Sequence, residues 1–402
     1  MPLAKTPCLL PLQVSVSIAT TPSASSSRHS VTVILFGFTP FGLIRSRYKH
    51  LDVAHSIATR RILKAMEQTI GPINEVLSAV MATLGEHMPR DLTWPMLLLM
   101  LAIATAIWLF RDGWGAKDAN GRVKHQSLIP FLLPKEIYTH TSAKVDVGLY
   151  FVERCLHPLW ATTFLVSVAP ATESSVISTL EALWGSGPTL TSHWGWMLLY
   201  SLVTLLVYDL LFYAIHYCEH KVPALWAIHK IHHSAEVLTP LTRYREHLIE
   251  GPIYAIGAAL AYGFSGGLFG WLFAGSIVPA TLFNLGFFAV LFGFNGAFRH
   301  YHVAFHYPRG LSRWLQSPVM HHIHHSYLEK HHDTNLAAVT SLWDRLFGTL
   351  YIPEKDEYTP WGLGPATQNQ YRSLAQNILG PFRDWALMLK ARSKGNQAMH
   401  HE

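Results

Sequence analysis

Charged residues are scarce in this chain. Asp, Glu, Lys and Arg make up 14% of its 402 residues, against roughly 25% in an ordinary soluble protein. Hydrophobic residues make up 50% and include 13 tryptophans. This composition excludes an ordinary soluble enzyme and predicts an integral membrane protein. The net charge of +6 is too small to indicate nucleic-acid binding, and membrane topology accounts for the basic residues.

Cysteine is also rare. The three cysteines, Cys8, Cys155 and Cys218, are too few and too widely spaced for a disulfide framework. Acidic residues are absent from residues 1–51, a composition typical of a transit segment or of a start codon placed too far upstream. We therefore expect three parts: an N-terminal extension over 1–92, a membrane-embedded domain over 93–353 and a C-terminal tail over 354–402.

Long uncharged runs predict the membrane-spanning segments, because a bilayer core requires about 20 apolar residues. Three single spans are expected, and a further uncharged stretch is long enough for a hairpin of two spans that breaks at Ser265–Gly267 and at Pro279. The expected spans are Trp94–Phe110, Cys155–Ala169, Trp194–Tyr217 and the hairpin Ile253–Phe298.

Charges in the connecting loops predict the topology. A basic loop follows Phe110, which places it in the cytoplasm, whereas the loop Pro170–Ser192 contains Glu173 and Glu181 but no Lys or Arg. If the spans are counted from the cytoplasmic loop after Phe110, all the histidine-rich segments are expected at the cytoplasmic face. The expected fold is an all-α integral membrane protein with four to five transmembrane or re-entrant helices and a cytosolic, histidine-rich helical cap that holds a di-metal site.

Histidines recur at fixed spacings in two regions. Positions four apart, or three and four apart, share one face of a helix, so these imidazoles are expected to converge. Asp209 lies two turns before the first of them and is expected to accept a hydrogen bond from a ligating ring. The spaced histidines are His216 and His220 (HxxxH), His229, His232 and His233 (HxxHH), and His321, His324 and His325 (HxxHH).

Eight imidazoles exceed the three or four ligands of a zinc site, so two metal ions are expected rather than one. Imidazole suits Fe, Zn, Cu and Ni, and ligand type alone leaves the metal open. Thiolates are not repeated in these segments, which argues against an iron–sulfur cluster.

The chain resembles the fatty acid hydroxylase/sterol desaturase superfamily of membrane non-haem di-iron enzymes over roughly residues 134–353. The resemblance is carried by DLLFYAIHYCEH, WAIHKIHHS, the RxH of Arg245 and His247, FRHYH, SPVMHHIHHS, and HHDTN followed by SLWDRLFGTLY. The segment LPKEIYTHTSAKVD, with Ser142 and Asp146, is also similar to bacterial members. One departure is Leu336–Ala337, where the family has an aromatic residue or Leu followed by Gly.

The resemblance implies that the eight spaced histidines are metal ligands. It also implies further ligands between the second and third boxes, for which His302 and His306 are the first candidates because they lie 19 and 15 residues before His321. His300 is the reserve. His247, His331, His332 and Asn335, together with Asp209, are candidates either for ligands or for hydrogen-bond partners of ligands.

The resemblance further implies two iron ions, O2 as co-substrate and removal of hydrogen from an unactivated lipid C–H, which ends in hydroxylation or desaturation of a sterol or fatty acyl type substrate. Electrons would come from NAD(P)H through a separate carrier, cytochrome b5-like or ferredoxin-like, because the sequence contains no CxxCH, HPGG or GxGxxG motif. Among locations, a bacterial inner membrane is favoured over the endoplasmic reticulum.

Two other functions remain as alternatives. A histidine-rich metal transporter would carry polar ligands at mid-span depth, whereas here the histidines lie at span ends. A zinc-dependent membrane hydrolase would use a glutamate base within HExxH, whereas Glu219 lies in HYCEH.

Overall fold

The computed structural model describes residues 36–39, 42–45, 94–113, 127–282, 285–286, 296, 298–354, 357 and 359–399. The chain divides into two compact units, Met1–Met88 and Pro89–Glu402. The described part of the first unit is an antiparallel hairpin of β1 (Phe36–Thr39) and β2 (Gly42–Arg45).

The described part of the second unit is helical, apart from one short antiparallel pair, β3 (Thr281–Leu282) and β4 (Leu285–Gly286). Its long helices are α2 (Trp94–Ile107), α5 (Thr141–Trp184), α6 (Trp194–Lys221), α7 (Pro223–His233), α8 (Glu250–Phe273) and α13 (Leu374–Met399). Its short helices are η2 (Trp108–Gly113), α3 (Leu128–Leu132), α4 (Lys135–Tyr138), η3 (Thr242–Tyr244), α10 (Arg309–Ser312), α11 (Pro318–His324), η4 (Glu329–His331), α12 (Leu342–Phe347) and η5 (Gln368–Tyr371).

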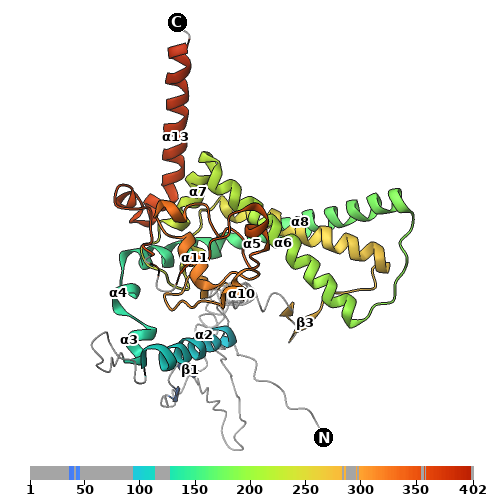
Figure 1. Cartoon of the computed structure of the whole chain (residues 1–402), viewed down its shortest axis with the longest axis horizontal. Coiled ribbons are helices and arrows are strands. Elements are labelled where there is room, and N and C mark those ends of the chain that lie inside the picture. The colour runs from blue at the N-terminus through green and yellow to red at the C-terminus, as the bar shows by residue number, and fades with distance from the viewer. Residues whose placement is uncertain are drawn as a thin grey trace, which may run out of the picture. The chain divides into compact units, whose positions relative to one another are not determined.

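Two of these helices, α6 and α8, are long and apolar enough to cross a bilayer. They extend together with α5 away from α7 and α11 (Figure 1). α6 begins at Trp194, where a span was expected, and continues four residues beyond Tyr217. α2 also begins where expected, but it is shorter than a bilayer core requires. The described helices thus support a membrane protein, and the number of spans stays a prediction.

The prediction of an outer loop over Pro170–Ser192 is wrong for most of these residues, because α5 continues as one helix of 44 residues to Trp184. Pro158 and Pro170 lie inside this helix. The polar residues after Pro170 are accommodated because their hydroxyls bond the carbonyl four residues earlier, as Thr172 does to Val168 at 2.8 Å. Polarity in this segment therefore does not end the helix.

The expected break at Ser265–Gly267 is also wrong, because α8 runs through it. Its glycines instead allow a close approach to α5. A Cβ added at Gly263 would lie 2.4 Å from the carbonyl oxygen of Ala169, and one at Gly267 would lie 2.6 Å from the Cβ of Val176. Small residues four apart at a helix contact are typical of packing between membrane helices. The second half of the expected hairpin lies largely outside the described residues.

A Gly267→Ala substitution should therefore destabilise the protein by about 1–3 kcal/mol through overpacking. Elsewhere in a helix the same change would stabilise by roughly 0.5–1 kcal/mol. Gly310→Ala in α10 is the matched control, because no atom lies within 4 Å of its added Cβ. Thermal denaturation in detergent checks the sign, and a Tm for Gly267→Ala at or above that of Gly310→Ala would contradict this packing.

Candidate metal centre

The histidine-bearing helices are brought together by a very short connection. α6 ends at Lys221 and α7 begins at Pro223, so Val222 alone joins them. Proline suits the first position of a helix because its missing N–H has no partner there. The chain thereby turns directly after His220 and presents the next histidines to the same space. α11 supplies the remaining box from a distant part of the sequence.

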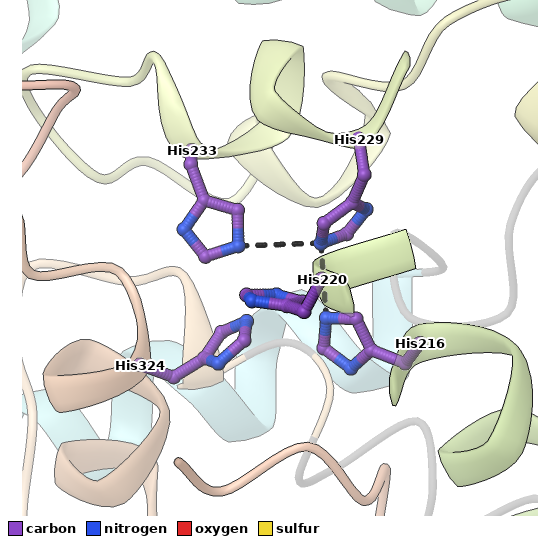
Figure 2. A group of neighbouring side chains, drawn as sticks. All are labelled: His216, His220, His229, His233 and His324. Carbon is purple, nitrogen blue, oxygen red and sulfur yellow. Dashed lines mark hydrogen bonds between the residues drawn. The ribbon is translucent and has the colours of Figure 1, made fainter. Parts of the chain in front are cut away.

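Five imidazoles form a first group. Each offers one ring nitrogen, and these nitrogens all lie within 4.8 Å of one another. Figure 2 shows the rings from α6, α7 and α11 pointing toward a common centre. The members are His216, His220, His229, His233 and His324.

Four imidazoles form a second group on the same distance criterion, and all four are buried. Its Nε2 atoms are separated by 2.8 Å between His321 and His300, 3.1 Å between His300 and His232, and 3.0 Å between His325 and His321. The members are His232, His300, His321 and His325.

The hydrogen bonds on the outer side of the first group determine where its protons lie. His216 Nδ1 is 2.6 Å from the carbonyl oxygen of Leu336, and His324 Nδ1 is 2.9 Å from that of Thr334. A carbonyl oxygen only accepts, so in both rings Nδ1 carries the proton and Nε2 carries a lone pair. His229 Nδ1 lies 2.6 Å from Glu250 and donates to it when that carboxylate is ionised.

These lone pairs face one another. His216 Nε2 and His229 Nε2 are 2.9 Å apart, although neither has a proton to donate. His220 Nε2 and His324 Nε2 are buried without a hydrogen-bond partner among the described residues. A cation at the centre would relieve this repulsion, and two nitrogens bound at right angles, each about 2.1 Å from a metal, are about 3 Å apart. The first group therefore fits a metal ion.

One ring of the second group, that of His321, carries its proton on a different nitrogen from the rings described above. Arg299 donates to His321 Nδ1 at 2.8 Å, which leaves the proton of a neutral His321 on Nε2, toward the centre. The Nδ1 atoms of His232, His300 and His325 are buried without a hydrogen-bond partner among the described residues, so no outer hydrogen bond fixes the tautomers of these rings. The distances between their Nε2 atoms match those of the first group. The second group thus has a ligand geometry, but a metal ion there would displace one proton.

Burial keeps the rings in the neutral, metal-binding form. Removal from water lowers the pKa of His229, His233 and His324 well below its ordinary value, and the neighbouring imidazoles lower it further. The same cause lowers the pKa of His232 to about 3. Because a histidine must be deprotonated to bind a metal, both groups are prepared for a cation at neutral pH.

Among the expected ligands, the structure brings the eight spaced histidines together and leaves His302 and His306 outside both groups. His302 Nε2 bonds the carbonyl oxygen of Phe131 at 2.9 Å. His300 occupies the second group in their place. The reason is that residues 300–303 form a bend and turn rather than a helix, so helical spacing does not predict which side chain points inward.

The other candidates lie around the groups rather than in them. His247 Nε2 bonds the carbonyl oxygen of Ile378, His331 bonds Glu357, and His332 bonds the carbonyl oxygen of Tyr327. Asn335, with a positive φ of 55°, bonds the backbone of Tyr351 in both directions. The contacts of His331, His332 and Asn335 hold the segment that follows α11, whereas the contact of His247 joins the loop before α8 to α13.

The expected contact between Asp209 and a histidine is not what the structure shows. Asp209 is fully buried and accepts hydrogen bonds from the backbone N–H groups of Ala338, Val339 and Thr340, each at 2.9 Å. A loop far away in sequence covers this face of α6 and supplies the partners. Asp209 therefore acts indirectly, by holding the segment whose Leu336 carbonyl orients His216.

Two glutamates bear on the site: Glu219 was weighed from the sequence only as the base of a hydrolase, and Glu250 was not predicted. Glu250 opens α8 and accepts from His229, and Glu219 lies 3.4 Å from the same ring nitrogen while accepting from Tyr254 at 2.7 Å. Both carboxyl groups are buried. For Glu250 the available signal was its position at the very start of an uncharged run, since a charge there needs a partner.

Two cavities reach the histidines from different sides. A cavity of about 330 Å³ between α5, α6 and α8 is lined by members of both groups, including His216, His229 and His300. A second cavity, of about 470 Å³, is lined by His220, His233 and His324 and by polar residues such as Asp333.

Comparison with known proteins gives the following matches. Residues 201–349, which contain all nine grouped histidines, match the family model for fatty acid hydroxylase. Alkylglycerol monooxygenase of Xenopus tropicalis is 30% identical over 168 residues, and that of Danio rerio is 29% identical over 168 residues. Each match covers 41% of this chain and 32% of the relative, so the chain spans about a third of the curated relatives it matches. No solved structure matches the chain.

Proposed function

Because the chain belongs to the fatty acid hydroxylase/sterol desaturase superfamily, we propose that it is a membrane-embedded, O2-dependent monooxygenase that hydroxylates a lipid C–H with two iron ions as its cofactor. The observation that carries this proposal is the cavity between α5, α6 and α8, which is lined by histidines of both groups. A lipid in that cavity meets both metal sites at once.

The residues of the chain have separable tasks in this reaction. The nine grouped histidines hold the ions, and the Leu336 and Thr334 carbonyls with Glu250 keep the ligating nitrogens of three rings turned inward. Phe212, Ala255 and Ala258 line the cavity with apolar surface that excludes water and orients the chain of the substrate. Bound iron at such a site supplies the capacity to reduce O2.

The overall reaction consumes a C–H bond, O2, two electrons and two protons, and it yields C–OH and water. We propose that the electrons come from NAD(P)H through a separate cytochrome b5-like or ferredoxin-like donor. The polar cavity lined by His220, His233 and His324 is the side from which such a donor approaches, because it reaches the first group without crossing the lipid cavity. We further propose that both groups lie at the cytoplasmic face of the membrane, and that this membrane is a bacterial inner membrane.

Metal content and lipid oxidation together test the proposal. Protein purified in detergent from iron-replete cells should contain about two iron ions per chain. With O2 and a reductant it should oxidise an alkylglycerol, the substrate class in the name of the similar proteins. Stoichiometric zinc that persists after anaerobic reconstitution with iron, together with no lipid oxidation, would instead favour the hydrolase or the transporter.

A further inference from the structure

The two histidine groups differ in what lies behind their rings. In the first group, an outer hydrogen-bond acceptor lies behind each of the rings of His216, His220, His229 and His324. Two of these acceptors are backbone carbonyls, and the other two are carboxyl groups, since Glu250 lies behind His229 and Asp333 Oδ1 lies 3.2 Å from His220 Nδ1. An acceptor in this position makes the inward nitrogen of the ring a stronger metal ligand.

The second group has no such acceptors among the described residues. The Nδ1 atoms of His232, His300 and His325 are buried without a hydrogen-bond partner there, and Nδ1 of His321 receives a hydrogen bond from Arg299. A guanidinium group has only donors and stays protonated in proteins. The second group therefore has a cationic donor at the place where the first group has neutral and anionic acceptors.

Arg299 is fixed in this position by the segment that covers α6. It is buried, and it donates to the carbonyl oxygens of Ala338 at 2.5 Å and Ala337 at 3.3 Å. Among the charged groups that act on Arg299, Arg243 repels it, whereas Asp209 and Asp344 attract it.

The two carboxylates stabilise the charge of Arg299 without being paired with it. Asp209 and Asp344 instead accept hydrogen bonds from the backbone N–H groups of residues 336–340, so that the same segment is held on its N–H side by carboxylates and on its carbonyl side by Arg299. The guanidinium therefore cannot turn away from His321 without giving up the carbonyls of this segment.

A metal ion in the second group meets an obstacle that the first group does not present. The ion has to bind Nε2 of His321, which carries the proton of the neutral ring because Nδ1 accepts from Arg299. Binding therefore requires either that the ring lose this proton or that the bond to Arg299 break. Each of these weakens binding, and the positive charge of Arg299 repels the ion as well.

We propose that Arg299 is a positioning residue that makes the second group the weaker of the two metal sites, so that the first group fills first and the second ion stays exchangeable. Asp333 acts in the opposite direction at the first group, because it strengthens His220 as a ligand. When metal is scarce, the chain then holds one ion, in the first group. This inference rests on the two-ion site of the proposed function.

An anaerobic titration tests the order of loading. Metal-free, full-length protein in detergent is titrated with cobalt(II), whose visible spectrum reports each bound ion. Two ions should bind with dissociation constants that differ by roughly tenfold or more, because a single residue that orients a ligand already changes metal affinity by about 10–100-fold. At one equivalent of cobalt, His300→Ala should bind as tightly as the unmodified protein, whereas His324→Ala should bind more weakly.

The same titration separates this inference from the proposed function. Two ions of equal affinity would overturn the inference and leave the two-ion site intact. Loss of the tight site in His300→Ala, with its retention in His324→Ala, would do the same, because the second group would then fill first. Fewer than two ions at saturation would overturn both the inference and the two-ion site.

Substitutions of Arg299 test whether it is the cause. Arg299→Gln removes the charge, and the amide oxygen can accept a proton from Nδ1 of His321, which frees Nε2 for the ion. The second ion should therefore bind roughly tenfold more tightly, with the first unchanged. Arg299→Lys keeps a cation and should keep the two sites unequal. Loss of structure only weakens binding, so a gain in affinity distinguishes the effect of the charge from an effect on packing.

Asp333→Asn provides a test of opposite sign. The Asp333 side chain is 33% exposed and pairs with Lys221, and asparagine tolerates the positive φ of 58° at this position, so the fold should be kept. The amide is a weaker acceptor for His220, and the first ion should bind roughly tenfold more weakly. Arg309→Gln is the control, because this side chain is 69% exposed, and both dissociation constants should stay unchanged.

Thermal denaturation identifies the folded variants in which these constants are compared. Unchanged constants in both Arg299→Gln and Asp333→Asn would overturn the inference. A second ion that binds more weakly in folded Arg299→Gln would also overturn it, because Arg299 would then support the second site instead of weakening it.

Discussion

Replacing His324 with alanine should remove the metal ion of the first group and abolish lipid oxidation, while the protein still inserts into the membrane. The reason is the set of facing lone pairs: His324 Nε2 points into the group and has no other partner among the described residues. Loss of a residue that merely orients a ligand costs about 10–100-fold in metal affinity, and loss of the ligand itself should cost more. Metal analysis of the purified variant measures the effect.

The matched comparison is His302→Ala. His302 lies near the same segment, but it bonds the Phe131 carbonyl and belongs to neither group. Its removal should leave the metal content unchanged, whereas His300→Ala should reduce it. His193→Ala is a second control, because this exposed ring caps α6 by accepting from Gly195 and belongs to neither group, so its loss should cost at most about 1 kcal/mol. Retention of full metal content by His324→Ala would sink the ligand assignment.

The difference between His300 and His302 shows how far spacing alone can predict a site. In α6, α7 and α11 the histidines follow the helical repeat, and the structure brings all eight together. Around residue 300 the backbone bends, and no repeat relates one side chain to the next. The orientation there depends on packing against Phe131, which comes from a distant segment.

Asp209 illustrates a second limit. Its position two turns before His216 is correct, because α6 is regular there. Its partners are nevertheless the backbone N–H groups of residues 338–340, since a buried carboxylate bonds whichever donors the tertiary fold supplies. Local periodicity does not contain that information, and the same holds for the glycines of α8, whose partner surface on α5 is set by tertiary packing.

The second large effect is expected at Arg245, which is completely buried between α5, α7 and the C-terminal segment. It donates to Asp146 at 2.8 Å, to the carbonyl oxygen of Ile231 at 2.9 Å and to the hydroxyl of Ser234 at 2.9 Å. Ile231 directly precedes His232 and His233. One guanidinium thus connects the start of α5 to the end of α7, where ligands of both groups are held.

Arg245→Met should destabilise the protein by about 3–5 kcal/mol, because it leaves the carboxylate of Asp146 buried without its charged partner. It should also lower the metal content of both groups, since the end of α7 loses two of its anchors. Denaturation in detergent and metal analysis of the folded fraction measure the two effects separately. Replacing both partners, as in Asp146→Leu with Arg245→Met, should recover part of the lost stability, because no unpaired charge then remains.

The matched control is Arg309→Met, which breaks an ion pair with Glu354 in which both side chains are well exposed, 69% and 75%. Exposed pairs contribute between about 0 and 1 kcal/mol, so this variant should keep its stability and its metal. If Arg245→Met matched Arg309→Met in both measurements, the buried network would not be what holds α7. If it lost stability but kept both metals, the ligands of α7 would be positioned by the histidine contacts alone.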